Sequence, residues 1–98
     1  MSDSELDLSI PASLADIEAE MKKFEDMRRR VSLGLYPRYL FLSQIRDIIK
    51  LTNAPLDSLR GMTHEEISTL LLYAMDDSGV DVLKLVQTLR KAREKSDT

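Results

Sequence analysis

The stretch that decides the fold is residues 10–35, IPASLADIEAEMKKFEDMRRRVSLGL. Apolar side chains recur in it at alternating steps of four and three residues, with one arginine among them: Ile10, Leu14, Ile17, Met21, Phe24, Arg28, Val31 and Leu35. This spacing places them in a narrow stripe along one side of a helix, as in helices that pack side by side. Arg28 stands where an apolar residue is expected. The stretch therefore predicts a helix that packs against another helix, in its own chain or in a partner.

The composition of the whole chain also favours helices. The 98 residues are enough for one small domain, and a hydrophobic content of 43% suffices for a packed core. Three glycines and three prolines leave few turns for an all-β fold, whereas Leu, Met, Ala, Glu, Lys and Arg are good helix formers. We predict an all-α fold, either a small antiparallel helical bundle or a long helical hairpin, with about four helices.

Local start and stop signals set the predicted bounds of these helices. Ser13 is a good N-cap, Pro37 suits the first position of a helix, and Gly61 suits the end of one. Thr63 and Glu66 have the spacing of a capping box. The predicted helices span about 14–32, 38–52 and 64–75 and begin again near 81, with a single helical turn at 56–60.

The predicted domain organisation follows from these bounds. Residues 1–11 are an acidic lead-in that we expect to be flexible. Residues 12–95 form a single helical domain, and residues 96–98 are a frayed C-terminus. No basic and apolar segment at the start resembles a secretory signal.

Charge is segregated along the chain, although the net charge is only −3. Residues 1–26 carry eight acids against two lysines, and residues 27–60 carry seven bases against two acids. Residues 61–79 hold four acids and no lysine or arginine, and residues 80–98 hold five bases against three acids. This alternation favours helices whose neighbours carry the opposite charge.

The charges beside the stripe predict which helix it meets. Glu20 and Glu25 would repel each other in a parallel self-pair. A basic antiparallel partner is favoured, and the basic helix after residue 81 of the same chain is preferred over packing across a dimer. Arg28 either marks the end of the packed zone or meets an acid such as Asp76 or Asp77.

No motif indicates catalysis. His64 is the only histidine and the chain lacks cysteine, so a structural zinc site has too few ligands. Glu65 and Glu66 follow His64 in a first helical turn, where polar residues serve capping. No glycine-rich loop is present to hold phosphate. We therefore expect no enzyme activity, no catalytic residue, no cofactor, no metal site and no small-molecule substrate.

The compartment is predicted from the same absences. A chain without cysteine fits a reducing environment, and its longest apolar runs, such as residues 70–75, are far too short to cross a bilayer. We predict a cytoplasmic protein with no membrane span.

The favoured function is a small non-enzymatic interaction module, such as an adaptor, assembly factor or regulator. It would bind a protein partner, or itself as a homodimer, through a helical surface. Aromatic residues and arginine are enriched among residues that dominate binding energy. The predicted contact residues are Met21, Phe24, Arg28 and Val31 along the stripe, with Tyr36, Tyr39 and Phe41 just beyond it.

The alternative function is a regulator associated with nucleic acid. Arginines and lysines near the end of the stripe could form a basic ridge that contacts phosphate: Lys22, Lys23, Arg28, Arg29, Arg30 and Arg38. Tyr36 and Tyr39 could stack on bases. The acidic residues 1–26 count against this function. Ser32 also follows Arg29-Arg30-Val31, the pattern of a basophilic phosphorylation site.

Overall fold

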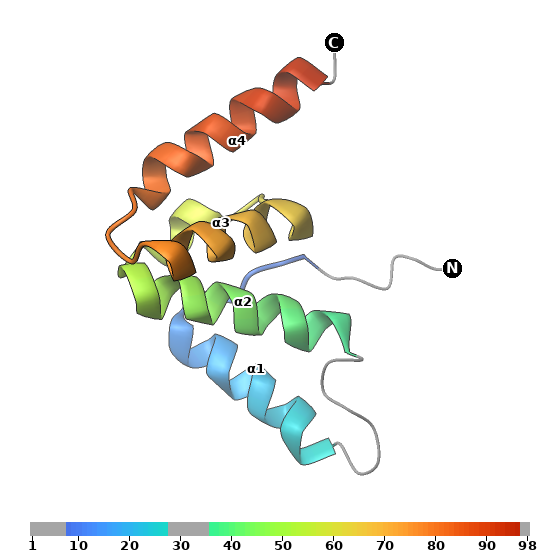
Figure 1. Ribbon diagram of the computed structural model, residues 1–98. Helices are drawn as coiled ribbons and strands as arrows, with labels where there is room; N and C mark the ends of the chain where they lie inside the picture. The colour runs from blue at the N-terminus through green and yellow to red at the C-terminus, as the bar shows by residue number, and fades with distance from the viewer. Residues whose placement is uncertain (1–7, 28–35, 97–98) are drawn as a thin grey trace.

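The chain forms an all-α bundle in a computed structural model that describes residues 8–27 and 36–96 (Figure 1). Its elements are α1 (Leu14–Met27), α2 (Pro37–Thr52), the 3-10 turn η3 (Leu56–Leu59), α3 (His64–Asp76) and α4 (Val82–Ser96). No strand occurs in these two described ranges. The prediction of a small all-α helical bundle is confirmed.

Most helix ends lie where the local signals predict them. The capping box of α3 is complete: Thr63 Oγ1 accepts from the Glu66 N–H at 3.1 Å, and Glu66 Oε1 accepts from the Thr63 N–H at 2.9 Å. Gly61 has a φ of +80°, the left-handed conformation that glycine adopts without strain. The predicted end of the first helix, near residue 32, lies outside the described residues.

The helices do not simply alternate in direction. α1 is antiparallel to α2, because Glu18 near its start lies 3.0 Å from Lys50 near the end of α2. α2 and α3 run in the same direction. Gln44 of α2 accepts a hydrogen bond from Ser68 of α3 at 3.3 Å. Seven residues further along each helix, Leu51 and Met75 line the same hollow. η3 and its flanking turns return the chain from the end of α2 to the start of α3 (Figure 1).

The main packing partner of α1 is α2, whereas α4 packs on α3 and η3. α1 and α4 lie on opposite sides of the α2–α3 pair (Figure 1). The prediction that the first helix packs mainly on the basic fourth helix is therefore wrong. Its glutamates do meet bases, but these are Arg38 and Lys50 of α2, the next helix in the chain. Consecutive helices are usually neighbours in space, as α1 and α2 are here.

One core holds all the elements together. Ile17 and Met21 of the stripe are buried in it, and Ile10 and Leu14 pack against its edge. Its buried members come from every helix: Ile17, Met21, Phe41, Leu42, Ile45, Ile48, Leu59, Met62, Ile67, Leu70, Val82 and Val86. In the described residues, the stripe is thus core rather than free surface.

The segment before α1 is held by two arginines. The Arg60 guanidinium donates to the carbonyl oxygens of Ile10 and, at 2.8 Å, Pro11. Arg38 donates to the carbonyl oxygen of Ser9. Residues 9–11 are therefore part of the packed domain, although we assigned them to the lead-in.

Candidate functional site

The predicted contact residues of the stripe occupy two different environments. Met21 is only 2% exposed and Phe41 is completely buried, so neither offers a surface in this conformation. Phe24 packs against two tyrosines, with ring centroids 5.5 Å from Tyr36 and 6.1 Å from Tyr39. These three rings are half-buried and join the ends of α1 and α2. The remaining predicted contact residues, Arg28 and Val31, lie outside the described residues.

The predicted basic ridge is only partly described. Arg38 is already bound within the fold, because its guanidinium donates hydrogen bonds to the carboxylate of Glu20 in α1. Lys22 and Lys23 are exposed, and the Nζ of Lys22 lies 3.9 Å from the Oδ1 of Asp26. The described part of the ridge therefore consists of two exposed lysines and an engaged arginine. The other members, Arg28, Arg29 and Arg30, lie outside the described residues.

Polar clusters suited to metal binding are missing from the part of the chain that the structure describes: it contains no group of three His, Cys, Asp or Glu side chains so placed. His64 stacks near Phe41, with ring centroids 5.9 Å apart, and its buried Nδ1 has no hydrogen-bond partner among the described residues. No helix in the described ranges is long and apolar enough to cross a membrane.

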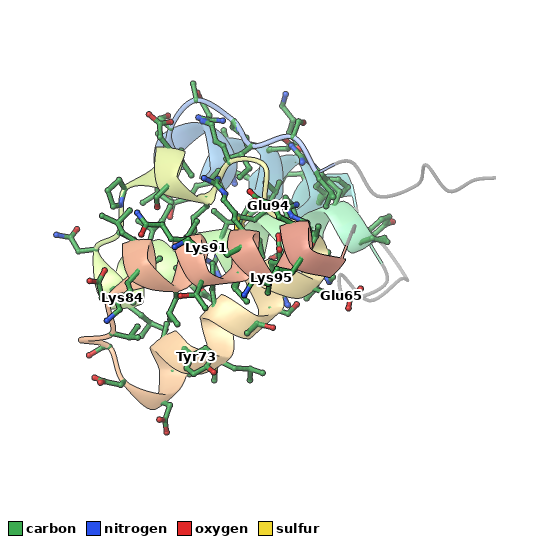
Figure 2. The ribbon with its side chains drawn as sticks, turned by 90° about the horizontal axis from the view of Figure 1, so that it is seen from above. Glu65, Tyr73, Lys84, Lys91, Glu94 and Lys95 are labelled. Carbon is green, nitrogen blue, oxygen red and sulfur yellow. The ribbon has the colours of Figure 1, made fainter. Side chains whose placement is uncertain are left out.

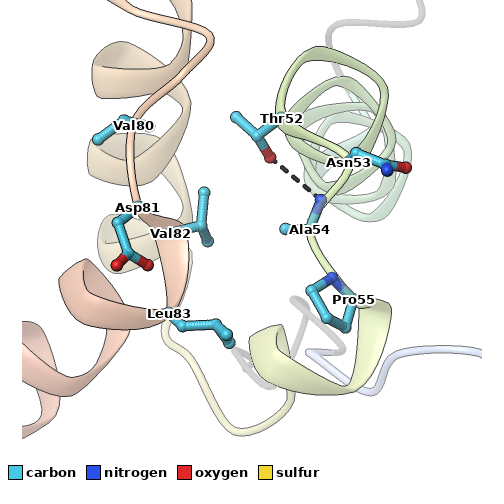
Figure 3. A pocket seen from close by; sticks show the side chains of 8 residues that line it. All are labelled: Thr52, Asn53, Ala54, Pro55, Val80, Asp81, Val82 and Leu83. Carbon is cyan, nitrogen blue, oxygen red and sulfur yellow. Dashed lines mark hydrogen bonds between the residues drawn. The ribbon is translucent and has the colours of Figure 1, made fainter.

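A hollow of about 200 Å³ lies between the end of α2 and the start of α4 (Figure 3). It is smaller than the roughly 300–1,000 Å³ of typical small-molecule sites. Its polar groups already serve the fold, since Thr52 Oγ1 bonds Ile48 O and the Ala54 N–H, while Asp81 Oδ1 accepts from the Lys84 N–H. The hollow is therefore small, and its Thr52 and Asp81 side chains are engaged within the fold, which makes it a weak candidate for a ligand site.

Among the described residues, the three most exposed large apolar side chains all lie on α3. Leu72 is 68% exposed, Met75 67% and Tyr73 51%, and Leu51 of α2 beside them is 42% exposed. Around the axis of α3, Met75, with Leu51 beside it, lies on one flank of Leu72 and Tyr73 on the other. We call these four residues the α3 outer face. Figure 2 shows Tyr73 on the side of the molecule away from α1.

Two shallow hollows of about 370 Å³ each lie along this face. One is lined by Leu51, Met75 and Leu71, together with Asp47 and Lys50 of α2. The other is lined by residues of α3 alone: Thr69, Leu72, Tyr73 and Asp76. The face therefore has relief into which side chains of a partner can fit.

Helix geometry explains why these residues are exposed. Leu70 and Ala74 are buried on the inner side of α3. Leu72 comes two residues after Leu70, which is about 200° around the helix and so on the opposite side. Six consecutive apolar residues, from Leu70 to Met75, cannot all face one core, and half of them point outward.

Acidic side chains lie at both ends of the α3 outer face. Glu65 and Asp76 are exposed, and no basic side chain in the described residues forms an ion pair with either. Residues 61–79 contain no lysine or arginine. The face is thus an apolar patch with negative charge at its ends.

Sequence reasoning missed this surface, although its signal was present. We used the apolar run at residues 70–75 only to exclude a membrane span. Six consecutive apolar residues on one helix cannot all reach the core of a small domain, so such a run predicts apolar side chains at the surface.

Comparisons with protein-family models, with curated proteins and with solved structures found no match for this chain. Its function must therefore be inferred from its residues and their arrangement.

Proposed function

We propose that this chain is a small protein-interaction module that acts by binding rather than by catalysis. Its contact surface is the α3 outer face, formed by Leu72, Tyr73, Met75 and Leu51. The observation that carries the proposal is the exposure of Leu72 and Met75, about two thirds each, on a helix whose opposite side is core. Contiguous exposed apolar patches on soluble domains commonly mark interaction sites.

The energy available at this face fits binding by a protein. Fully burying a Leu or Met side chain contributes about 1.5–3 kcal/mol relative to leaving it exposed. Leu72 and Met75 have most of that gain still to make, because both are largely exposed in the isolated chain. A partner helix placed along the face would bury them together, as amphipathic helices do in apolar grooves.

This proposal moves the contact surface away from the stripe of α1. Met21 serves the core, and Phe24 and Tyr39 are shared between packing and surface. The aromatic cluster of Phe24, Tyr36 and Tyr39 stays a candidate for secondary contacts, because its rings are half-exposed. The main contact is assigned to α3, because its Leu72 and Met75 are the most exposed large apolar side chains among the described residues.

Affinity capture with matched variants tests the proposal. The tagged chain, a Leu72→Gln/Met75→Gln variant and a Leu8→Gln/Leu83→Gln control are compared, since both variants lose two exposed apolar side chains. Circular dichroism and thermal melting first establish that all three fold. The proposal predicts that a partner recovered by the wild type and the control is lost from the α3 variant. Equal recovery of every bound protein by all three contradicts it.

A further inference from the structure

We infer that the occupant of the α3 outer face is a basic amphipathic helix of another protein. This inference rests on the proposed function and adds the chemistry of the partner. The partner would present an apolar stripe to Leu72 and Met75, which are three positions apart on α3, and place lysine or arginine near Glu65 and Asp76.

The first argument is the placement of the two acids. Glu65 and Asp76 are eleven positions apart, which is about three helical turns and about 16 Å. Asp76 lies directly beside Leu72 and Tyr73, and Glu65 lies about two helical turns before Leu72 on the same side of α3. A helix lying along α3 meets negative charge at both ends of its apolar stripe, and complementary bases favour both its approach and its register.

The second argument is that nearby bases are already paired. Lys50, which lines the hollow beside Leu51, lies 3.0 Å from Glu18 of α1. Arg46 lies 3.1 Å from Asp47 in the same helix. Among the described residues, these two bases of α2 are therefore engaged within the fold, whereas Glu65 and Asp76 have no ion-pair partner that a basic helix would replace.

A second copy of this chain fits the face poorly. Two α3 helices packed antiparallel would set Glu65 against Asp76 of the other copy, and packed parallel they would set each acid against its equivalent. Like charges placed opposite each other are destabilising in both arrangements. α4 has exposed bases at Lys84 and Lys91 (Figure 2). The exposed side chains between them, Gln87 and Thr88, are polar, and Leu83 alone does not form an apolar stripe that could cover Leu72.

The partner's sequence pattern follows from the geometry. Its apolar residues recur at i, i+3 or i+4, and i+7, which forms one stripe on a helix. Its lysines or arginines stand beside that stripe about eleven positions apart, to match the acids of α3. Binding should weaken as salt is raised, because exposed charge pairs are screened.

Two synthetic probes test the inference on the full chain. The basic probe is an 18-residue helical peptide with leucines in one stripe and lysines elsewhere, and the acidic probe has glutamate at every lysine position. Both carry a fluorescent label, and binding is followed by fluorescence anisotropy at low and at high salt. We expect the basic probe to bind about tenfold more tightly than the acidic probe at low salt, with the difference shrinking at high salt.

Three variants separate docking on α3 from general attraction of a basic peptide to an acidic protein. Leu72→Gln/Met75→Gln keeps every charge and should weaken binding of the basic probe about tenfold. Glu65→Lys/Asp76→Lys should reverse the preference between probes. The control Asp26→Lys/Glu94→Lys makes the same change in net charge on α1 and α4 and should keep the wild-type preference.

Each outcome decides the inference. Equal binding of both probes, or reversal by the Asp26→Lys/Glu94→Lys control, overturns the basic partner but leaves the apolar contact surface intact. Unchanged binding by Leu72→Gln/Met75→Gln places the peptide elsewhere and overturns the assignment to α3. Absence of binding by either probe overturns helix recognition, while the affinity-capture comparison still judges the proposed function. A salt-resistant dimer that Leu72→Gln abolishes would assign the face to a second copy instead.

Discussion

The guanidinium of Arg38, at the start of α2, donates two hydrogen bonds to the carboxylate of Glu20 in α1. Its Nε lies 2.7 Å from Oε2, and its Nη2 lies 3.1 Å from Oε1. The Arg38 side chain is only 13% exposed, and it also bonds the carbonyl oxygen of Ser9. One arginine therefore joins α1, α2 and the segment before α1. Bidentate arginine–carboxylate pairs are among the stronger polar contacts in proteins.

Replacing this arginine should destabilise the bundle. We expect Arg38→Ala to lower the free energy of unfolding by about 2 kcal/mol, because it removes charge-assisted hydrogen bonds from a mostly buried group. Arg38→Lys should recover little of this, since an ammonium cannot make the paired contact. Urea denaturation of Arg38→Ala, Glu20→Ala and the double variant measures the coupling. A coupling near zero would show that the two side chains act independently.

Leu70 and Leu72 of α3 should differ in how much they contribute to the free energy of unfolding. We expect Leu70→Ala to lower the free energy of unfolding by about 2–5 kcal/mol, because Leu70 is fully buried. Leu72→Ala should change it by less than about 0.5 kcal/mol, because Leu72 is mostly exposed. Chemical denaturation measures the free energy of unfolding of both variants, and the substitution, leucine to alanine, is the same in each. Similar losses from both substitutions would mean that α3 is packed on both sides.

The capping box predicts a graded effect at Thr63. We expect Thr63→Ala to cost about 1 kcal/mol of stability, because the Glu66 N–H loses its acceptor. Thr63→Ser keeps a hydroxyl and should stay close to the wild type. Thr88→Ala is a control in the middle of α4, where no cap is lost. Thermal melts rank the three, and a wild-type melting temperature for Thr63→Ala would contradict this role of the cap.

Arg60 should control the motion of the segment before α1. Its side chain bonds the carbonyl oxygens of Ile10 and Pro11, and we expect Arg60→Ala to release them. The heteronuclear ¹⁵N NOE of Ser9, Ile10 and Ala12 should then fall, reporting faster motion on the ps–ns timescale.

Asp57→Ala is the matched control for Arg60. It removes the 2.8 Å contact between Asp57 and the Arg60 Nε but leaves both carbonyl contacts. The NOE values of residues 9–12 should stay close to the wild type in this variant. A fall of equal size in both variants would show that the salt bridge, rather than the carbonyl contacts, holds the segment.

Helix ends were the part of the fold most open to prediction. Pro37, Thr63 and Gly61 act through backbone geometry and hydrogen bonds within a few residues, so their effects can be read locally. The observed α2 begins at Pro37, one residue before the predicted start, and α3 ends at Asp76, one residue after the predicted end.

The partner of α1 was harder to predict, because charge complementarity does not identify one helix. Glu18 and Glu20 require bases, and both α2 and α4 supply them. The shared direction of α2 and α3 was not predictable either, since it depends on how η3 returns the chain. These choices are made by packing across the whole core, which periodicity in one segment does not encode.

The candidate site was missed for a related reason. The stripe of α1 has the regular spacing that suggests an interface, but Ile17 and Met21 are used for the core. The exposed apolar face lies on α3. The buried side of this helix is formed by Ile67, Leu70 and Ala74, and Leu72 and Met75 are apolar residues outside that side. Only the position of α3 in the bundle shows that its outer side is left exposed by the described residues.

The central claim is that the α3 outer face is the contact surface. An NMR titration of the ¹⁵N-labelled chain with the basic amphipathic peptide tests it most directly. The predicted result is that amide shift changes concentrate at residues 71–76 of α3 and at Leu51 of α2, while α1 stays unmoved. The largest changes on α1 or α4, with the amides of α3 unmoved, would contradict it.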